Sequence, residues 1–254
     1  MSHKRDNQRA ITVRIGGLAA DLYLPGRPVR TGVVFLHGGG FVGGSRTQFA
    51  KICRRLSANG PTACLSLDYR LAPEYNFPAP VQDAVEAFRW LMQATGLAAE
   101  RIVLAGGSPG GCIAALAVLS GAEQHAAWNI LPGASPKRAI LLNGICDLPG
   151  FYRQNPGEQA RVRAFLGGDL QKLQEADPGR YRPEGRSLLL LHGTADEVVL
   201  PEQCRAFAHG LELAGSHAQT VWFYGKAHAW FNTPGQDVPV AHCIGRYLQR
   251  ISKE

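Results

Sequence analysis

Residues 102–119 read Ile-Val-Leu-Ala-Gly-Gly-Ser-Pro-Gly-Gly-Cys-Ile-Ala-Ala-Leu-Ala-Val-Leu. The stretch begins as a short apolar run with β-branched residues, which is typical of a strand buried on both faces. It ends as a run rich in alanine and leucine, closed by Gly121, which predicts a buried helix. Between the two, residues 106–110 match Gly-x-Ser-x-Gly, a pattern that describes a nucleophile elbow when it joins a strand to a helix. Ser108 is therefore the candidate nucleophile.

The rest of the chain alternates between strand and helix patterns on both sides of this unit. An initial hairpin is followed by strands and helices in turn, which predicts a mostly parallel central sheet with helices on both faces. Thr47 is a candidate cap for the helix expected at 49–58, and Gly215 ends the helix that begins at Pro201. The expected strands are 11–15, 20–24, 32–36, 62–67, 102–105, 138–143, 187–191 and 219–224, and the expected helices outside the elbow are 49–58, 81–93, 201–215 and 240–251.

One segment breaks the alternation. Residues 148–186 are rich in glycine, proline and charge, and they carry one weak helical run at 159–165. We interpret the segment as a small lid insertion, and residues 1–254 as a single domain, since this length suits one large hydrophobic core.

Composition narrows the range of partners. The net charge of +7 comes from basic residues that are scattered rather than clustered, and no nucleic-acid-binding motif is present, so we expect no nucleic acid partner. Residues 1–9 lead into no apolar stretch, which predicts no signal peptide, and no segment is long enough for a membrane span. The six cysteines lack metal-ligand spacing and are expected to be reduced and buried. We expect a cytoplasmic protein that needs no cofactor or metal.

Three chemistry-bearing residues follow predicted strands. Ser108, Asp196 and His228 each come after the carboxyl end of a strand, where ligands collect in such sheets. Their order along the chain, Ser then Asp then His, is that of α/β-hydrolases. A serine hydroxyl needs a base to take its proton, and the base needs a carboxylate to hold its tautomer. These residues form the predicted catalytic triad.

Other residues compete for two of these roles. Asp147 follows another predicted strand and is the best alternative acid, and Glu197 is a weaker one. His37 and His192 also end strands, but their glycine-rich neighbours indicate backbone packing. The remaining histidines lie at the N-terminus or on helices and loops away from the strand ends, namely His3, His125, His209, His217 and His242.

Further motifs extend the pattern beyond the triad. Residues 37–41 read His-Gly-Gly-Gly-Phe, followed by Gly44-Ser45, and residues 68–74 read Asp-Tyr-Arg-Leu-Ala-Pro-Glu. Together with the elbow and the two later loops, the chain from about residue 32 onward is similar to the hormone-sensitive-lipase-like carboxylesterases. The resemblance implies an α/β-hydrolase fold and cleavage of short-chain esters without a cofactor. It also implies that Gly39 and Gly40 offer N–H groups to an oxyanion, and that residues 68–74 brace this loop.

The sequence departs from that family in three places. Members usually carry an N-terminal helical cap, whereas here the hairpin begins near residue 11, so an open site covered only by residues 148–186 is expected. The residue before the nucleophile is commonly Asp, and here it is Gly107. The residue after the nucleophile supplies an oxyanion N–H in these enzymes, but Pro109 has none.

A serine hydrolase acting on small esters is the function that these features favour. An amidase similar to arylformamidases is the nearest alternative, although a tryptophan often stands there at the position of Phe41. A lyase or cyclase that uses the pocket for proton abstraction, and a non-catalytic small-molecule receptor, are alternatives from other classes. Receptors of this fold tend to lose the histidine, which is present here. The acyl group, the leaving group and the oligomeric state, including a homodimer, are left open.

Overall fold

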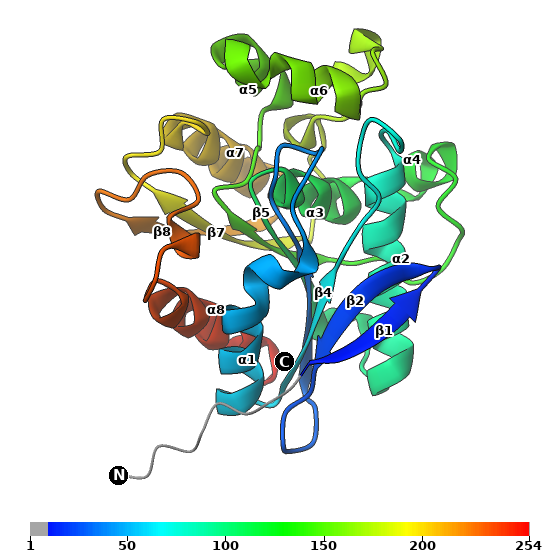
Figure 1. The fold of residues 1–254 in the computed structure, drawn as a ribbon, viewed down its shortest axis with the longest axis vertical. Helices are drawn as coiled ribbons and strands as arrows, with labels where there is room; N and C mark the ends of the chain where they lie inside the picture. The colour runs from blue at the N-terminus through cyan, green and yellow to red at the C-terminus, as the bar shows by residue number, and fades with distance from the viewer. Residues whose placement is uncertain (1–9, 254) are drawn as a thin grey trace.

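The computed structural model of this chain describes residues 10–253. In these residues, strands form one sheet in the order β1-β2-β4-β3-β5-β6-β7-β8 (Figure 1). β1 and β2 form an antiparallel edge hairpin and β2 runs antiparallel to β4, whereas all pairs from β4 to β8 are parallel, so the predicted fold class is confirmed. The strands are β1 (Ile11–Ile15), β2 (Leu18–Tyr23), β3 (Thr31–Leu36), β4 (Thr62–Leu67), β5 (Ile102–Gly107), β6 (Arg138–Leu142), β7 (Ser187–Gly193) and β8 (His217–Phe223).

Residues 1–9, on which the expectation of no signal peptide rests, lie outside the described part of the chain, as does His3.

The central strands owe their apolar sequences to burial on both faces. Every residue of β3, β4 and β5 is buried, and successive side chains alternate between the two sides of the sheet. Val34 and Leu104 belong to one hydrophobic cluster, and Phe35 and Ala105 belong to the other. The sheet is therefore a rigid platform, and its carboxyl edge carries the loops that matter for function.

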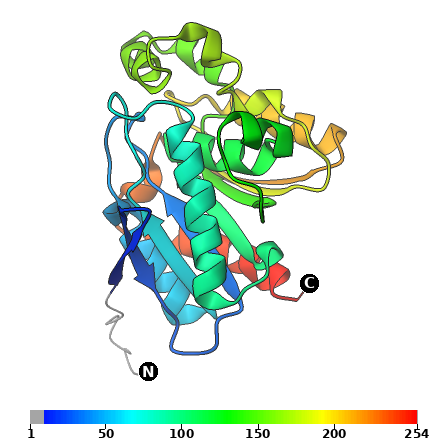
Figure 2. The same ribbon diagram turned by 90° about the vertical axis from the view of Figure 1, so that its right-hand side faces the viewer.

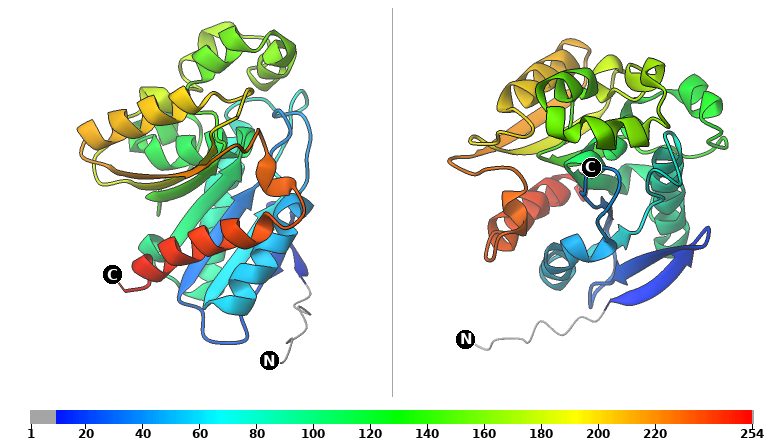
Figure 3. Two further views of the ribbon diagram at one scale, coloured as in Figure 1. Left: turned by 90° about the vertical axis from the view of Figure 1, so that its left-hand side faces the viewer. Right: turned by 45° about the horizontal axis from the view of Figure 1, so that its top comes forward.

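Helices cover both faces of this sheet. α1 and α8 pack on the face that includes Phe35 (Figure 3, left), and α2, α3 and α7 pack on the face that includes Val34 (Figure 2). The helices are α1 (Ala50–Asn59), α2 (Ala79–Thr95), α3 (Pro109–Leu119), α4 (Ala122–Ala127), α5 (Leu148–Gln154), α6 (Gln159–Phe165), α7 (Pro201–Leu213) and α8 (Asp237–Ile251).

Two predicted helix boundaries are wrong. Gly121 does not end α3, whose C-cap is Ser120; it caps the start of α4, a short polar helix that the sequence analysis did not predict. Thr47 is not a cap either, because it lies inside a 3₁₀ turn that precedes α1. The Ser45 hydroxyl caps that turn by accepting the Thr47 N–H at 3.4 Å.

Residues 148–186 lie beyond the carboxyl edge of the sheet, where α5 and α6 cross above the other elements (Figure 1). The helical run at 159–165 is present as α6, but α5 was not predicted. The Asp147 carboxylate caps α5 by accepting the Gly150 N–H at 2.7 Å, and Pro149 lies in the first turn. That the chain is a single domain and that this segment acts as a lid stay predictions.

Candidate active site

Ser108 stands on a strained turn between β5 and α3. Its φ of 52° and ψ of −118° are unfavourable for a residue with a side chain and cost on the order of 1–3 kcal/mol, so the surroundings must hold them. The Ser108 N–H donates to the Leu142 carbonyl of β6 at 3.0 Å, and the Ser108 carbonyl accepts from the Gly111 N–H at 3.0 Å. A Cβ on Gly106 would collide with the backbone of Gly110, so the elbow requires its small residues.

The histidine and the aspartate meet this serine. His228 Nε2 lies 2.9 Å from Ser108 Oγ, while His228 Nδ1 lies 2.8 Å and 3.1 Å from the two carboxylate oxygens of Asp196. When Nδ1–H donates to the carboxylate, Nε2 is the acceptor that faces the serine hydroxyl. The Asp196 side chain is fully buried, and that of His228 is 18% exposed. Ser108, Asp196 and His228 are far apart along the chain, yet together they form one continuous hydrogen-bonded relay.

The carboxylate of Asp196 is held as an anion by its neighbours. The backbone N–H groups of Val198 and Val199 donate to Oδ1 at 3.0 and 2.9 Å, and the Asn143 side-chain amide donates to Oδ2. Burial acts to raise the pKa of Asp196, but the hydrogen bonds from His228, Val199 and Asn143 outweigh it and hold the pKa below its ordinary value. A fixed negative charge therefore faces His228.

Two residues beside Asp196, Asn143 and His192, were not predicted as site residues. Asn143 follows β6 with a positive φ of 48°, and its position at the end of a strand is a signal that could have identified it. His192 at the end of β7 was interpreted as backbone packing. Its Nε2 lies 2.9 Å from the Val199 carbonyl and 3.5 Å from the nearer oxygen of Asp196, and burial lowers the His192 pKa. A neutral imidazole thus supports the loop that carries the aspartate.

The alternative acids and the alternative base lie elsewhere. The Asp147 carboxylate is used as the cap of α5, and Glu197 is exposed. His37 is buried, stacks on Tyr69 with ring centroids 4.3 Å apart and bonds through Nδ1 with the Gly38 carbonyl at 2.8 Å. Within the described residues, Asp147, Glu197 and His37 form no hydrogen bond with Ser108 or His228.

The loop after β3 (residues 37–45), which we call the glycine loop, lies at the same edge. Gly39 and Gly40 have φ of 127° and 65°, values that side-chain-bearing residues rarely adopt. Their N–H groups donate to no acceptor within residues 10–253, whereas the neighbouring Gly38 N–H donates to Gln48 Oε1 at 2.6 Å. Two donors are therefore available at this point for a ligand oxygen.

Residues 68–74 brace this loop, as the sequence analysis expected. The Tyr69 hydroxyl donates to the His37 carbonyl at 2.7 Å, and the Ala72 N–H donates to the Phe41 carbonyl at 3.1 Å. The Asp68 carboxylate forms an ion pair with Arg46 just beyond the loop. These contacts restrict the backbone of the glycine loop.

The two departures at the elbow have different consequences. A Cβ on Gly107 would lie 2.7 Å from the ring of Phe231, so the packing of this aromatic residue explains why the position before the nucleophile is glycine. Pro109 is the first residue of α3 and supplies no N–H. The glycine loop lies beside the elbow, where an added Cβ on Gly38 would be 3.2 Å from the Gly107 carbonyl oxygen, so the N–H groups of Gly39 and Gly40 are the remaining candidate donors.

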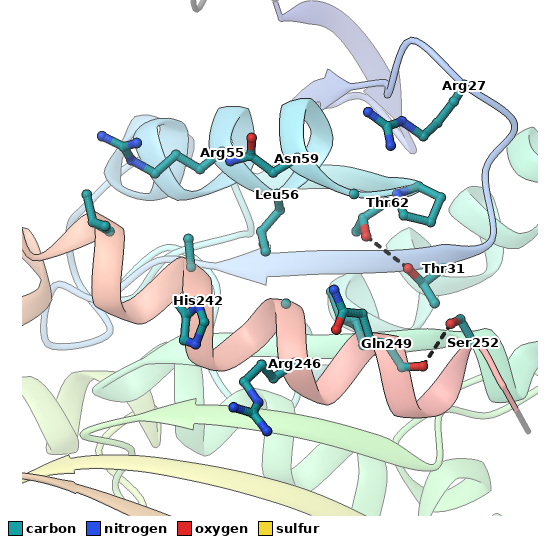
Figure 4. A pocket seen from close by; sticks show the side chains of 16 residues that line it. Arg27, Thr31, Arg55, Leu56, Asn59, Thr62, His242, Arg246, Gln249 and Ser252 are labelled. Carbon is teal, nitrogen blue, oxygen red and sulfur yellow. Dashed lines mark hydrogen bonds between the residues drawn. The ribbon is translucent and has the colours of Figure 1, made fainter. Parts of the chain in front are cut away.

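A separate pocket lies at the opposite edge of the sheet. It has a volume of about 610 Å³ and opens between α1 and α8, beside Thr31 and Thr62 at the amino ends of β3 and β4 (Figure 4). Arg27 donates to the Ala58 carbonyl at 3.4 Å, and Arg55 forms an ion pair with Asp237. None of the triad residues lines this pocket, so it is not part of the candidate site.

All six cysteines are free, and five of them are buried as expected, whereas Cys243 is partly exposed. Within residues 10–253, no group of three His, Cys, Asp or Glu side chains is arranged to hold a metal ion, and no helix is long and apolar enough to span a bilayer.

The sheet is mostly parallel, a strained serine follows one of its central strands, and an acid and a histidine follow later strands. These features define the α/β-hydrolase class. The sequence of residues 33–176 matches the family model described as "alpha/beta hydrolase fold", and the chain belongs to that family. A second model, for the prolyl oligopeptidase family, matches residues 157–254, which is less than half of the chain.

Known relatives agree with this placement. "Lipase 2" of Moraxella sp. (strain TA144) is 37% identical over 79% of this chain, and "Ethyl acetate hydrolase" of Pseudomonas putida is 29% identical over 86%. The matches span 54% and 73% of those two proteins, so the chain covers only about half of the lipase. The crystal structure of an esterase from the bacterial hormone-sensitive lipase family superposes with a TM-score of 0.79 at 26% identity, covering 99% of this chain and 87% of that one. The predicted resemblance to this group is confirmed.

Proposed function

We propose that this chain is a serine carboxylesterase that cleaves small esters through an acyl-enzyme intermediate. The single observation that supports this most strongly is the relay from Ser108 through His228 to Asp196, with hydrogen bonds of 2.9 and 2.8 Å. The names of the relatives, which include lipase, esterase and ethyl acetate hydrolase, point to the same chemistry.

The proposed reaction begins at the serine hydroxyl. Ser108 Oγ attacks the ester carbonyl carbon as its proton passes to His228 Nε2, and the carbonyl oxygen becomes an oxyanion. The Asp196 carboxylate stabilises the imidazolium that forms. The free N–H groups of Gly39 and Gly40 are the proposed donors to the oxyanion.

Collapse of this intermediate restores the carbonyl and breaks the bond to the alcohol, which leaves with the proton from His228 Nε2 while the acyl group stays on Ser108 Oγ. Water then attacks the acyl carbon, with His228 again accepting a proton. The second tetrahedral intermediate releases the carboxylic acid and returns the proton to Ser108 Oγ. Water supplies all the atoms that the products contain beyond the ester, so the proposed cycle needs no cofactor.

Pro109 affects which leaving groups the proposed enzyme can expel. A hole with two donors stabilises the oxyanion less than one with three, which favours esters or formamides that are already activated. An arylformamidase-like amidase is accordingly the second candidate function. Comparing kcat/KM for p-nitrophenyl acetate with that for formanilide separates the two, because a larger value for formanilide would favour the amidase.

The triad is tested with single substitutions and p-nitrophenyl acetate as the substrate. Ser108→Ala and His228→Ala are expected to lower kcat by about 10⁴-fold or more. Ser252→Ala and His242→Ala, which lie on or just beyond α8 away from the site, are matched controls that should retain full activity. Hydrolysis that survives in folded Ser108→Ala would refute the proposed nucleophile.

We also propose a cytoplasmic location, because six free cysteines suit a reducing compartment. A homodimer is left open, and light scattering of the purified protein would measure the oligomeric state.

A further inference from the structure

The helix α6 contacts the glycine loop at two neighbouring residues. The ring of Phe165 stacks on that of Phe41, with centroids 4.0 Å apart and an interplanar angle of 16°. One turn earlier on α6, the side chain of Arg161 lies against Gly40, where an added Cβ would be 2.5 Å from Arg161 Cδ. The segment above the sheet edge in Figure 1 is thus attached to the loop that carries the two free N–H groups.

Phe41 is held in an unfavourable backbone conformation. Its φ of 68° is rare for a bulky residue and costs on the order of 1–3 kcal/mol, so packing around it must compensate. Phe41 and Phe165 are both buried, with 1% and 0% exposure. The Ala72 N–H fixes the Phe41 carbonyl at 3.1 Å, and the stack with Phe165 holds its ring within the hydrophobic core.

Phe165 is itself held firmly. Its carbonyl accepts the Phe77 N–H at 2.7 Å, and its ring contacts that of Phe77 edge-on at 5.7 Å. The ring of Phe77 in turn packs edge-on against Trp128 at 5.1 Å. The end of α6 is therefore anchored to the main body of the protein, and it can transmit that rigidity to Phe41.

The contact of Arg161 with Gly40 is made by its carbon stem. The guanidinium forms an ion pair with Glu158 at 2.7 Å, while the side chain as a whole is 51% exposed. The stem thereby covers Gly40 without donating a hydrogen bond to the loop.

We propose that Phe165 and Arg161 are positioning residues that clamp the glycine loop and hold the Gly39 and Gly40 N–H groups toward the oxyanion. This inference rests on the proposed function and goes beyond it, because it assigns a catalytic consequence to α6. The clamp matters more in this chain than in a hole with three donors, since Pro109 leaves only two to align.

Steady-state kinetics of Phe165→Leu with p-nitrophenyl butyrate test the proposal. Loss of one aligned donor costs about 10²- to 10³-fold in kcat, and partial misalignment of two is expected to lower kcat at least tenfold while KM changes less than twofold. Phe151→Leu is the matched control, because Phe151 is also buried, at 3% exposure in α5, and its ring does not stack on Phe41. A folded Phe165→Leu protein with the kcat of the wild type would overturn the clamp.

The arginine gives a second series that does not threaten folding, because its side chain is half exposed. Arg161→Ala removes the stem and is expected to lower kcat several-fold, and Arg161→Met, which keeps an unbranched stem, is expected to lose less. Equal losses in the two variants would show that the charge, which both lack, is what acts, and a larger loss in Arg161→Met than in Arg161→Ala would contradict the role of the stem.

Hydrogen–deuterium exchange of residues 37–44 separates this inference from the esterase proposal. Exchange there should be faster in Phe165→Leu than in the wild type or in Phe151→Leu. If the wild type hydrolyses no ester, the esterase proposal fails while the exchange result still decides whether α6 restrains the loop. Unchanged exchange would contradict the clamp even in an active enzyme.

Discussion

Replacing Pro109 by alanine would give the first turn of α3 a backbone N–H next to the nucleophile. The turn is already built without this donor, because the Gly111 and Cys112 N–H groups both donate to the Ser108 carbonyl, at 3.0 and 3.2 Å. Pro109→Ala therefore removes no hydrogen bond. It adds one donor at the position from which α/β-hydrolases complete the oxyanion hole.

The expected gain follows from the value of a single donor. Removing one from an oxyanion hole typically costs about 10²- to 10³-fold in kcat, or roughly 3–4 kcal/mol. A site that operates with two donors should recover part of this, so we expect kcat to rise at least several-fold. Losing the proline makes the unfolded chain more flexible, which lowers the free energy of unfolding by about 0.4–1 kcal/mol. In a protein of this size, that lowers Tm by only about 1–4 °C.

The assay compares kcat of the wild type and Pro109→Ala on p-nitrophenyl acetate and on a simple alkyl ester. The rise should be larger on the alkyl ester, whose oxyanion needs more stabilisation. Pro201→Ala is the matched control, since Pro201 is also the first residue of a helix, α7, but does not adjoin the nucleophile. An unchanged or lower kcat in a variant with nearly unchanged Tm would mean that another group already completes the oxyanion hole.

Three further predictions follow from the same structure. Asp196→Asn should lower kcat strongly and Asp147→Asn should affect stability more than rate, because only Asp196 contacts the histidine; a larger kcat loss in folded Asp147→Asn would contradict this assignment. A series of p-nitrophenyl esters should give its highest kcat/KM with acetyl to butyryl chains if α5 and α6 are the only cover of the site, and a maximum at eight carbons or more would argue against an open site. Burial lowers the pKa of His37, His125 and His192, each of which takes up a proton on unfolding at a pKa of about 6.5; the free energy of unfolding should therefore fall as pH drops from about 7 to 5, and urea titrations that show no slope in this range would contradict the neutral buried rings.

Much of the fold could be predicted because its signals are local. The apolar runs of β3, β4 and β5 reflect burial on both faces, and such strands read alike in any parallel sheet. The elbow around Ser108 was equally visible, since its glycines are required by backbone approach. Helix ends were less certain: the Asp147 cap and Pro149 were local signals for α5, but the glycine and charge around them favoured an irregular loop.

What could not be predicted depends on contacts between distant residues. The amide of Asn143 reaches the carboxylate of Asp196, which is 53 positions later, and no local pattern specifies such a bond. The same is true of the stack between Phe41 and Phe165, because each residue alone is indistinguishable from an ordinary core aromatic. The sequence could thus identify the groups that react, and only the fold shows what holds them.

The mass of the intact protein after treatment with a fluorophosphonate shows whether Ser108 is an activated nucleophile. The wild type is expected to gain one phosphonyl group per chain, and Ser108→Ala is expected to gain none. An unmodified wild type, or equal labelling of Ser108→Ala, would contradict this role of Ser108.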